Sequence, residues 1–587
     1  MLLLTLDGIL LLFITLGLGV LFKTGLEKLF RTPLHAGLLE LFLTGLVFST
    51  IYFNLVSYGR PVNYTCLLPL IAGLLLFFGL NRQRYRQLVL LIRERAGVVF
   101  SGPGAFFGIC LLLLLCAYFI KPPGNPDSAT YHYLSIFWYE KYKVVPGLAN
   151  LQGRFAFNPA SFIIQAAYSF TDLTGSSLYP LNGVTTGLFL FWLLARVLRH
   201  LHTYAGLVYL LLLAMLGRET LGNMSSPSSD LLMLVCTVYS LLRFFELIHS
   251  NEITPGKLVI PMVVALYAPV AKLSAFPLLA ILAFMLYRLP GRHTKLLLAG
   301  KLFLTAALIY IPWLGRNVIQ SGYLLYPFPY IDLFHVDWKA PKEVLLVDYY
   351  NAKYSPIFGS ALLTFHQKPS APFHAWFLTW FRYIYTHLPL VFLMVVAAFC
   401  SPLLWVFLYM RKRKPDAVSL IFYLLVYAGV WLWVVTSPDA RFGMAFISMS
   451  VILPLLAATE NHRKIPAVVL PALFTCFTVY YLYADYLFFG YDRRRRTHAV
   501  NEKSAWIYPL QHPAYKPYPP KPLPYTILNT GVKLYFDIPG QLCDNTCLPC
   551  MSWRYGAIEM RGPSLSDGFR NTRNDVKKAF PFIRETP

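Results

Sequence analysis

Six ionisable side chains stand out because they lie in short polar stretches beside long apolar runs. The stretches are "PDSATYH" with Asp127, "SPSSD" with Asp230, "APVAKLS" with Lys272, "LGRN" with Arg316, and "SPDARF" with Asp439 and Arg441. A charged side chain at membrane depth costs about 2.5 to 3.5 kcal/mol on insertion, so each needs a structural or functional reason. Together, such carboxylates and cations can accept a proton from a hydroxyl and bind a phosphate, which is the chemistry of group transfer from a phosphorylated donor.

Each stretch also has a simpler interpretation. An Asp just before a helix, as Asp127 and Asp230 are predicted to be, commonly caps the helix by accepting a backbone N–H bond. A single cation at the end of a span, such as Lys272, commonly extends to the lipid head groups. Independent caps and anchors would not need to gather at one membrane face, so the set as a whole favours a charged pocket there.

Within such a pocket the residue types suggest roles. Lys272, Arg316 and Arg441 are the predicted ligands of a donor phosphate, because Arg offers a planar fork of donors and Lys a compact charge. A nearby carboxylate can act as the general base that activates an acceptor hydroxyl. A carboxylate here could instead hold a divalent cation, Mg²⁺ or Mn²⁺, through oxygen ligands, and the residues leave that alternative open.

The composition indicates which elements must position these residues. Of the 587 residues, 57% are hydrophobic and 13% charged, whereas soluble chains carry about 25% charged residues. The apolar runs are long enough to cross a bilayer as helices and lack the alternation of barrel strands. We therefore predict an all-α polytopic membrane protein with about fourteen transmembrane helices, over residues 2–22, 35–56, 64–80, 103–120, 179–198, 203–218, 230–248, 257–271, 274–290, 297–315, 388–410, 417–436, 442–459 and 465–487.

The same architecture explains the net charge of +24. Basic clusters at 23–31, 196–200 and 411–414 fit cytoplasmic loops under the positive-inside rule, so nucleic acid is not a predicted partner. This assignment places two large loops, 121–178 and 316–387, and the C-terminal tail outside the cytoplasm. The "DRRRR" stretch at 492–496 would then lie on the outer side, against the rule, which leaves the sidedness of the tail open.

Residues 1–487 form the predicted membrane domain, and 488–587 form a Pro-rich linker followed by a cysteine-containing tail. The stretch "CDNTCLPC" contains Cys543, Cys547 and Cys550. In an oxidising compartment these allow one disulfide and leave one thiol, whereas a zinc site would need a fourth ligand that the sequence does not clearly offer. No protein metal site is predicted.

These stretches resemble the glycosyltransferase C superfamily, integral membrane glycosyltransferases that use polyprenyl-phosphate-linked sugars. The resemblance rests on an acid in the first outer loop, an "SPSSD" turn, a "KLS" outer turn, and an Arg that begins a second outer loop running into "SGYLLYP". More narrowly, "VVPGLANLQGRFAFNPASF", "VDWKAPKEV" and "RGPSLSDGF" resemble a group of large bacterial membrane proteins without an assigned activity. The resemblance spans most of the chain.

The resemblance implies roles for further residues. Asp127 would be the essential acid, and the substrate pocket would include His132, Arg154, Asn158, Asp230 and Asp439. His132, Arg154 and Asn158 could equally tie the loop in place. Many members carry paired acids in the first outer loop, whereas the nearest acid after Asp127 here is Glu140. This departure favours a single base, or a site shared with Asp230 or Asp439.

The resulting hypothesis is a multi-pass enzyme of the bacterial inner membrane with its active face outside the cytoplasm. It would move a sugar from a polyprenyl-phosphate-linked donor to an extracytoplasmic acceptor, in contact with membrane lipids. Two alternatives remain: a transporter or flippase of a lipid-linked or anionic solute, and a non-catalytic scaffold of envelope-polysaccharide assembly. The sugar, the acceptor and the oligomeric state are not predicted.

Overall fold

The computed structural model describes residues 2–119, 121, 123, 125, 127–358, 373–410, 416–459, 464–496, 522–536, 548–551 and 557–572. Cys543, Cys547 and the Pro-rich stretch at 497–521 lie outside the described residues. Cys550 is disulfide-bonded, while the cysteines of the membrane domain, among them Cys66, Cys110 and Cys236, are free.

Nine helices of the described chain are long and apolar enough to span a membrane. They are α1 (Leu2–Phe30), α2 (Leu38–Val56), α10 (Leu181–Arg199), α11 (Tyr204–Asn223), α12 (Asp230–His249), α15 (Arg292–Ser321), α19 (Pro389–Met410), α20 (Ala417–Thr436) and α21 (Ala440–Ala458). Shorter apolar helices are α5 (Pro103–Phe119), α13 (Pro255–Ala271), α14 (Leu278–Arg288) and the first half of α22 (Val469–Arg496). The predicted all-α, membrane-spanning class is confirmed, and each predicted crossing overlaps a helix, although the total of fourteen spans stays a prediction.

One helix that the sequence did not predict is α4 (Arg82–Phe100), which follows α3 (Leu67–Leu80). The stretch Tyr64–Leu80 and α4 are bent by 102° at their junction, and counting this pair as one span gives ten. Five arginines interrupt the apolar residues of α4, so its sequence indicates a basic loop rather than a helix.

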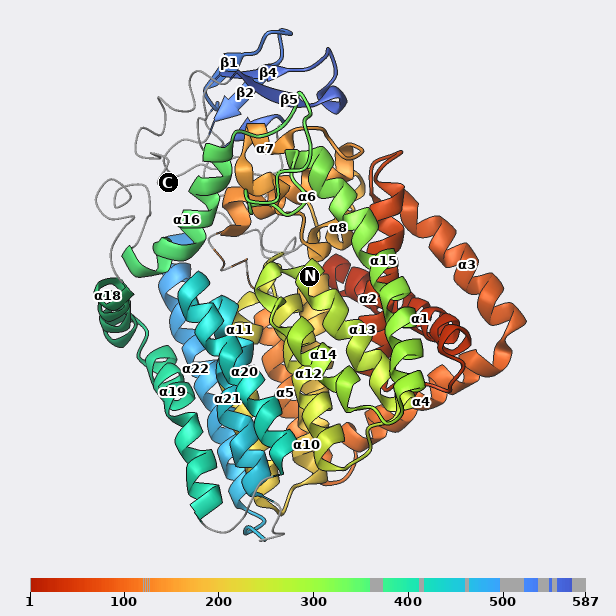
Figure 1. Ribbon diagram of the computed structural model, residues 1–587, viewed down its shortest axis with the longest axis vertical. Helices are drawn as coiled ribbons and strands as arrows, with labels where there is room; N and C mark the ends of the chain where they lie inside the picture. Colours follow the sequence, from red (N-terminus) through yellow and green to blue (C-terminus); the bar gives the residue numbers. More distant parts are fainter. Residues whose placement is uncertain are drawn as a thin grey trace.

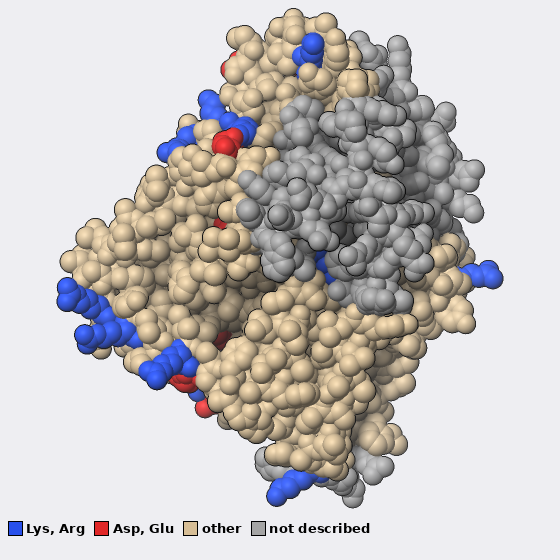
Figure 2. Space-filling view, turned by 180° about the vertical axis from the view of Figure 1, so that it is seen from behind, with Lys and Arg blue, Asp and Glu red and all other residues tan. Residues whose placement is uncertain are grey.

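The centre of the bundle is α12, where every residue from Asp230 to Leu242 is buried. A helix that is apolar all round needs neighbours on every side, and α12 packs against α10, α13, α20 and α21. The opposite situation holds at the periphery, where Figure 2 shows a broad uncharged face with Lys and Arg side chains at its margins. That distribution fits a bundle whose outer surface contacts lipid.

The two large loops and the tail gather at one end of the bundle (Figure 1). The first loop forms α6 (Tyr133–Lys141), α7 (Leu148–Leu151), α8 (Ala160–Ala167) and α9 (Thr171–Thr174), and the second forms α16 (Lys342–Phe358) and α18 (Phe373–His387). The described part of the tail adds five short strands: β1 (Tyr525–Ile527) pairs with β2 (Lys533–Phe536), which pairs with β3 (Cys550–Met551), and β4 (Ala557–Met560) pairs with β5 (Phe569–Thr572).

Specific contacts fasten these three segments together. The Asn150 side chain donates to the carbonyls of Trp338 at 2.8 Å and Phe569 at 3.2 Å, so one amide of the first loop holds both the second loop and the tail. Arg561 of the tail pairs with Asp337 of the second loop at 2.8 Å. The sequence placed the three segments on one side of the membrane, and the structure places them at one end of the molecule.

Candidate functional site

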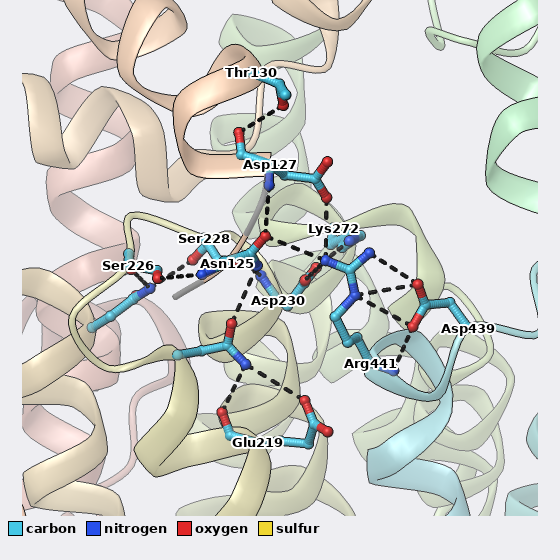
Figure 3. A network of polar contacts seen from close by, with 12 residues as sticks. Asn125, Asp127, Thr130, Glu219, Ser226, Ser228, Asp230, Lys272, Asp439 and Arg441 are labelled. Atoms are coloured by element: carbon cyan, nitrogen blue, oxygen red, sulfur yellow. Dashed lines mark hydrogen bonds and ion pairs between the residues drawn. The ribbon is translucent and has the colours of Figure 1, made fainter. Parts of the chain in front are cut away.

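Arg441 is the hub of an ion-pair cluster beneath the two loops (Figure 3). It is the second residue of α21, and its guanidinium lies 2.9 Å from Asp439, 3.1 Å from Asp127 and 3.7 Å from Asp230. Asp439 also caps α21 by accepting the Arg441 backbone N–H at 3.0 Å. The "SPDARF" turn therefore fixes an arginine and a carboxylate side by side, with the arginine facing two more acids from remote segments.

Lys272 supplies the second cation of the cluster. It follows the last residue of α13, and its ammonium forms a hydrogen-bonded ion pair with Asp230, the first residue of α12. The same ammonium lies 3.6 Å from the centroid of the Phe442 ring, a favourable cation–π contact. Lys272 thus points into the protein rather than outward to the head groups.

Arg154 links Asp127 to a carboxylate that the sequence analysis missed. It lies 3.2 Å from Asp127 and 3.8 Å from Asp348 of α16. Asp348 is buried and accepts a 2.7 Å hydrogen bond from the Tyr326 hydroxyl. Asp348 was hard to identify from the sequence because "KEVLLVDYY" has the pattern of an ordinary amphipathic helix, and no short polar stretch surrounds this acid.

Asp127 is held as a carboxylate by its neighbours. Burial alone would raise its pKa, but Arg154 and Arg441 outweigh the burial and hold the pKa below its ordinary value. For Asp348 the effect of burial is larger than the opposing effects of Arg154 and Tyr326, and its pKa is raised to about 6. At neutral pH the side chain of Asp127, about a quarter exposed, is therefore an anion clamped between two guanidinium groups.

His132 is neutral and buried beside this cluster. Burial lowers its pKa to about 4, and its ring interacts electrostatically with Asp127, Asp230 and Arg441. The ring packs against Phe162 with centroids 5.1 Å apart, and Nδ1 has no hydrogen-bond partner. The ring contacts of His132 within the described residues are aromatic, so its role in substrate binding stays a prediction.

The loop segment that carries Asp127 is tied to the bundle by amides. Asn125 accepts the Asp127 backbone N–H at 3.0 Å, lies 3.5 Å from Arg441, and donates to Asn223 at 3.2 Å. Asn223 in turn donates to the Glu219 carboxylate at 3.5 Å at the end of α11. Glu219 and Asn223 were missed, although an acid and an amide near the end of an apolar run are a recognisable signal.

The "SPSSD" turn that carries Asp230 is fixed from below. The Asn182 side chain of α10 donates to the carbonyls of Ser226 at 2.6 Å and Ser228 at 2.7 Å, and Gln165 of α8 donates to Pro227 at 3.2 Å. These bonds satisfy carbonyls of a buried turn that lies outside any helix or sheet, where backbone hydrogen bonds would otherwise satisfy them. They explain why Asp230 enters the cluster at a defined position.

Arg316 and Asn158 do not join the cluster, and their assignment to the phosphate and substrate sites stays a prediction. Arg316 is 1% exposed; its Nε donates to the Asn158 side chain at 3.1 Å, and its guanidinium lies 4.4 Å from the centroid of the Tyr139 ring. Asn158 also bonds Trp313 and Asn317 at 3.2 and 2.9 Å. This second group attaches the first loop to α15.

Two further observations bound the chemistry. Among the described residues no three His, Cys, Asp or Glu side chains are placed so that they could hold a metal ion. A cavity of about 120 Å³ borders Asp439 and is lined mainly by apolar and aromatic side chains, including Trp380, Trp433 and Leu388. In this arrangement the apolar pocket can accept the hydrocarbon chain of an amphiphile, and the ionic cluster can accept its charged head group.

Comparison with known proteins gives one match. Residues 1–448 match the family described as Domain of unknown function (DUF8201), which covers the whole cluster up to Arg441. The chain matches no curated protein and no solved structure.

Proposed function

We propose that this chain, which belongs to the DUF8201 family, is a membrane glycosyltransferase that uses a polyprenyl-phosphate-linked sugar. The observation that carries the proposal is the convergence, in one place below the loops, of five residues from four separate stretches: Asp127, Asp230, Lys272, and the pair Asp439 and Arg441. Three of these carboxylates contact a single guanidinium, which is more than capping or anchoring requires. The extracytoplasmic orientation of this end and the bacterial inner membrane are parts of the same proposal.

The charge balance of the cluster suggests how the donor would bind. Arg441 and Lys272 are already paired with carboxylates, so a phosphate must compete with those carboxylates for the cations. The Arg441 guanidinium contacts three acids. Some of its N–H groups could donate to a phosphate while others stay bonded to Asp439, which lies two residues earlier in the chain. Loss of the Arg441 contact would raise the pKa of Asp127 toward its ordinary value, because one of its two compensating cations would be engaged elsewhere.

Donor binding would therefore prepare the base. In the transfer step the acceptor hydroxyl loses its proton to Asp127 as its oxygen bonds the anomeric carbon. The bond between that carbon and the phosphate oxygen breaks, and the polyprenyl phosphate leaves with the electron pair. Arg441 and Lys272 would stabilise the charge on the departing phosphate, where preorganised cations have the greatest effect. The apolar cavity beside Asp439 would receive the first part of the prenyl chain.

The test measures release of free polyprenyl phosphate by the full-length protein in nanodiscs, supplied with a panel of polyprenyl-phosphate-linked hexoses and pentoses and an envelope extract. At least one donor should be consumed, and Asp127→Asn should slow its consumption by about 10²- to 10⁴-fold, the usual contribution of a general base. The matched control is Asp332→Asn, an exposed second-loop acid paired only with Lys339 in the described structure, which should stay within about twofold of wild type.

Other outcomes would assign other functions. If no donor is consumed but an intact labelled donor crosses the bilayer of sealed vesicles, the protein is a transporter and the transferase proposal is wrong. If Asp127→Asn matches wild type in both assays while the protein still supports envelope polysaccharide synthesis in cells, a scaffold role replaces it.

A further inference from the structure

A second cavity, with several charged side chains in its lining, lies between α2, α4, α10 and α12. Its volume is about 510 Å³, within the range of ligand sites. Its polar lining includes Arg95 of α4, Arg196 and Arg199 of α10, and Arg243 of α12, with Glu40 of α2 as its acid. It shares no lining residue with the ion-pair cluster around Arg441, so it is a separate site.

Two of the four arginines are committed to the fold. Arg196 makes two bonds to Glu246, at 2.7 and 3.1 Å, and stacks on the Trp192 ring with the guanidinium 3.5 Å from the ring centroid. Arg243 bonds the same carboxylate at 2.6 Å. Glu40 accepts the Gly37 backbone N–H at the start of α2, at 3.2 Å. These groups form a rigid wall whose charges are mutually balanced.

The other two arginines are not balanced. Arg199 forms no ion pair with any residue in the described part of the chain, and Arg95 reaches only Glu94, at 3.8 Å, a glutamate that is 64% exposed. The Arg95 Nε is buried without a hydrogen-bond partner. Arg196, Arg95 and Arg243 repel Arg199, whereas Glu246 attracts it. Arg199 is exposed and the Arg95 side chain is 36% exposed, so two like charges beside one cavity, one with a buried unpaired donor, can bind an anion from outside.

Apart from His35, the remaining walls of the cavity are mainly apolar. They include Val98, Val99, Phe100, Leu188 and Phe191, and the Phe100 and Phe191 rings contact each other with centroids 5.7 Å apart. The helix α4 lies at 102° to the apolar stretch before it and carries arginines between its apolar residues, which is typical of a helix lying along a membrane surface at the end of a span. A cavity under such a helix is at head-group depth.

We propose that this cavity binds an anionic phospholipid, with its phosphate between Arg95 and Arg199 and the start of an acyl chain against Phe100 and Phe191. The paired arginines select negative charge and the apolar walls select a lipid over a free anion. The basic cluster at 196–200, assigned to the cytoplasmic side, includes Arg199, so the lipid would come from the leaflet opposite the ion-pair cluster. The site is independent of the proposed transferase activity.

The experiment is native mass spectrometry of the full-length protein with phosphatidylglycerol, phosphatidylcholine or inorganic phosphate added. Wild type should retain phosphatidylglycerol at least about tenfold more strongly than phosphatidylcholine. Since each basic side chain near an anionic lipid contributes about a fivefold effect, Arg95→Ala/Arg199→Ala should lose at least about tenfold in affinity. The control, Arg86→Ala/Arg93→Ala, removes the same charge from exposed positions of α4 that do not line the cavity and should stay within about twofold.

A third variant keeps the test decisive if the double variant unfolds. Ala96→Phe adds a ring to the cavity wall from an exposed position of α4 and should also weaken phosphatidylglycerol binding while leaving every arginine in place. Equal losses in the control and test double variants would show a general surface-charge effect and overturn the proposal. Binding of inorganic phosphate that displaces the lipid would make this a free-anion site instead, and unchanged binding in both cavity variants would remove the site altogether.

Discussion

Removal of the Arg441 guanidinium should destabilise the protein in a way that depends on pH. In Arg441→Ala, Asp127, Asp230 and Asp439 lose the cation that contacts all three, at distances of 3.1, 3.7 and 2.9 Å. Lys272 then compensates only Asp230, and Arg154 only Asp127 within this group. The three carboxylates face one another with one positive charge fewer.

The magnitude follows from the burial of each pair. Removing one partner of a fully buried ion pair costs about 3–5 kcal/mol, whereas an exposed pair contributes about 0–1 kcal/mol. The side chains of Arg441, Asp439 and Asp127 are 27%, 22% and 25% exposed and that of Asp230 is 8% exposed, between the two limits. We expect a total loss of about 3 kcal/mol at pH 7, which for a chain of 587 residues lowers Tm by about 2–3 °C.

The pH dependence has a definite sign. The pKa of Asp127 is lowered in the folded protein by Arg154 and Arg441, so its contribution to stability is present above its unfolded value of about 3.9 and is lost as the pH falls below it. In Arg441→Ala the crowded carboxylates take up protons at higher pH than in wild type. The Tm difference between wild type and Arg441→Ala should therefore shrink as the pH is lowered from 7 toward 4.

The measurement is Tm by intrinsic fluorescence in detergent at both pH values. Arg382→Ala, an exposed arginine on α18, is the control and should change stability by no more than about 0.5 kcal/mol. A double variant gives the sharpest test. Asp439→Asn alone should destabilise, but in the Arg441→Ala background it should stabilise, because it removes a repelling carboxylate and Asn still caps α21. Additive losses from the two substitutions would refute the shared-hub interpretation.

Three further predictions concern the supports of the cluster. Asn182→Ala should cost about 2–3 kcal/mol and lower Tm, since it leaves the buried Ser226 and Ser228 carbonyls unsatisfied; Tm at the wild-type value would show that water replaces the amide. Gly153→Ala should also lower Tm, by about 1–3 kcal/mol in stability, because the added methyl would collide with the Asp348 carboxylate and the Tyr326 hydroxyl. Burial raises the pKa of Asp348 to about 6, so the folded protein binds more protons than the unfolded chain between about pH 4 and 6, and stability falls as pH rises through that window. Asp348→Asn should flatten this slope in a Tm-against-pH series, and an unchanged slope would contradict the assignment.

Much of the helical architecture could be predicted from hydropathy, because a lipid environment leaves the backbone few alternatives to the helix. The failure at α4 has a physical cause. Its arginines at 82, 84, 86, 93 and 95 make it polar enough to resemble a cytoplasmic loop, whereas its apolar residues pack against α5, α10 and α3. The five tail strands were missed because each has only two to four residues, too few for an alternating pattern.

The site could be predicted in part. Five residues of the cluster could be predicted because each interrupts an apolar run, and in a membrane protein such interruptions are costly enough to be informative. They are Asp127, Asp230, Lys272, Asp439 and Arg441. Arg316 interrupts an apolar run in the same way but lies apart, buried with Asn158 and Tyr139. The type and position of an interruption cannot tell whether an arginine is satisfied by carboxylates or by an amide and a ring, because that depends on the rotation of α15.

The cluster couples the loops to the bundle as well as carrying charge, and this constrains how any activity can be tested. Asp127 and Arg154 belong to the first loop, Asp348 to the second, and Arg441 to a helix of the bundle, so one chain of ion pairs connects three parts of the molecule. A phosphate that drew Arg441 away from Asp127 would weaken the connection between the first loop and α21 at the moment of binding. Substitution by Ala removes charge and connection together, whereas Asp127→Asn keeps the volume and one acceptor oxygen. Comparison of Asn with Ala at this position therefore separates loss of base chemistry from loss of loop attachment: Ala should lower Tm more than Asn does, and both should slow transfer by about 10²- to 10⁴-fold.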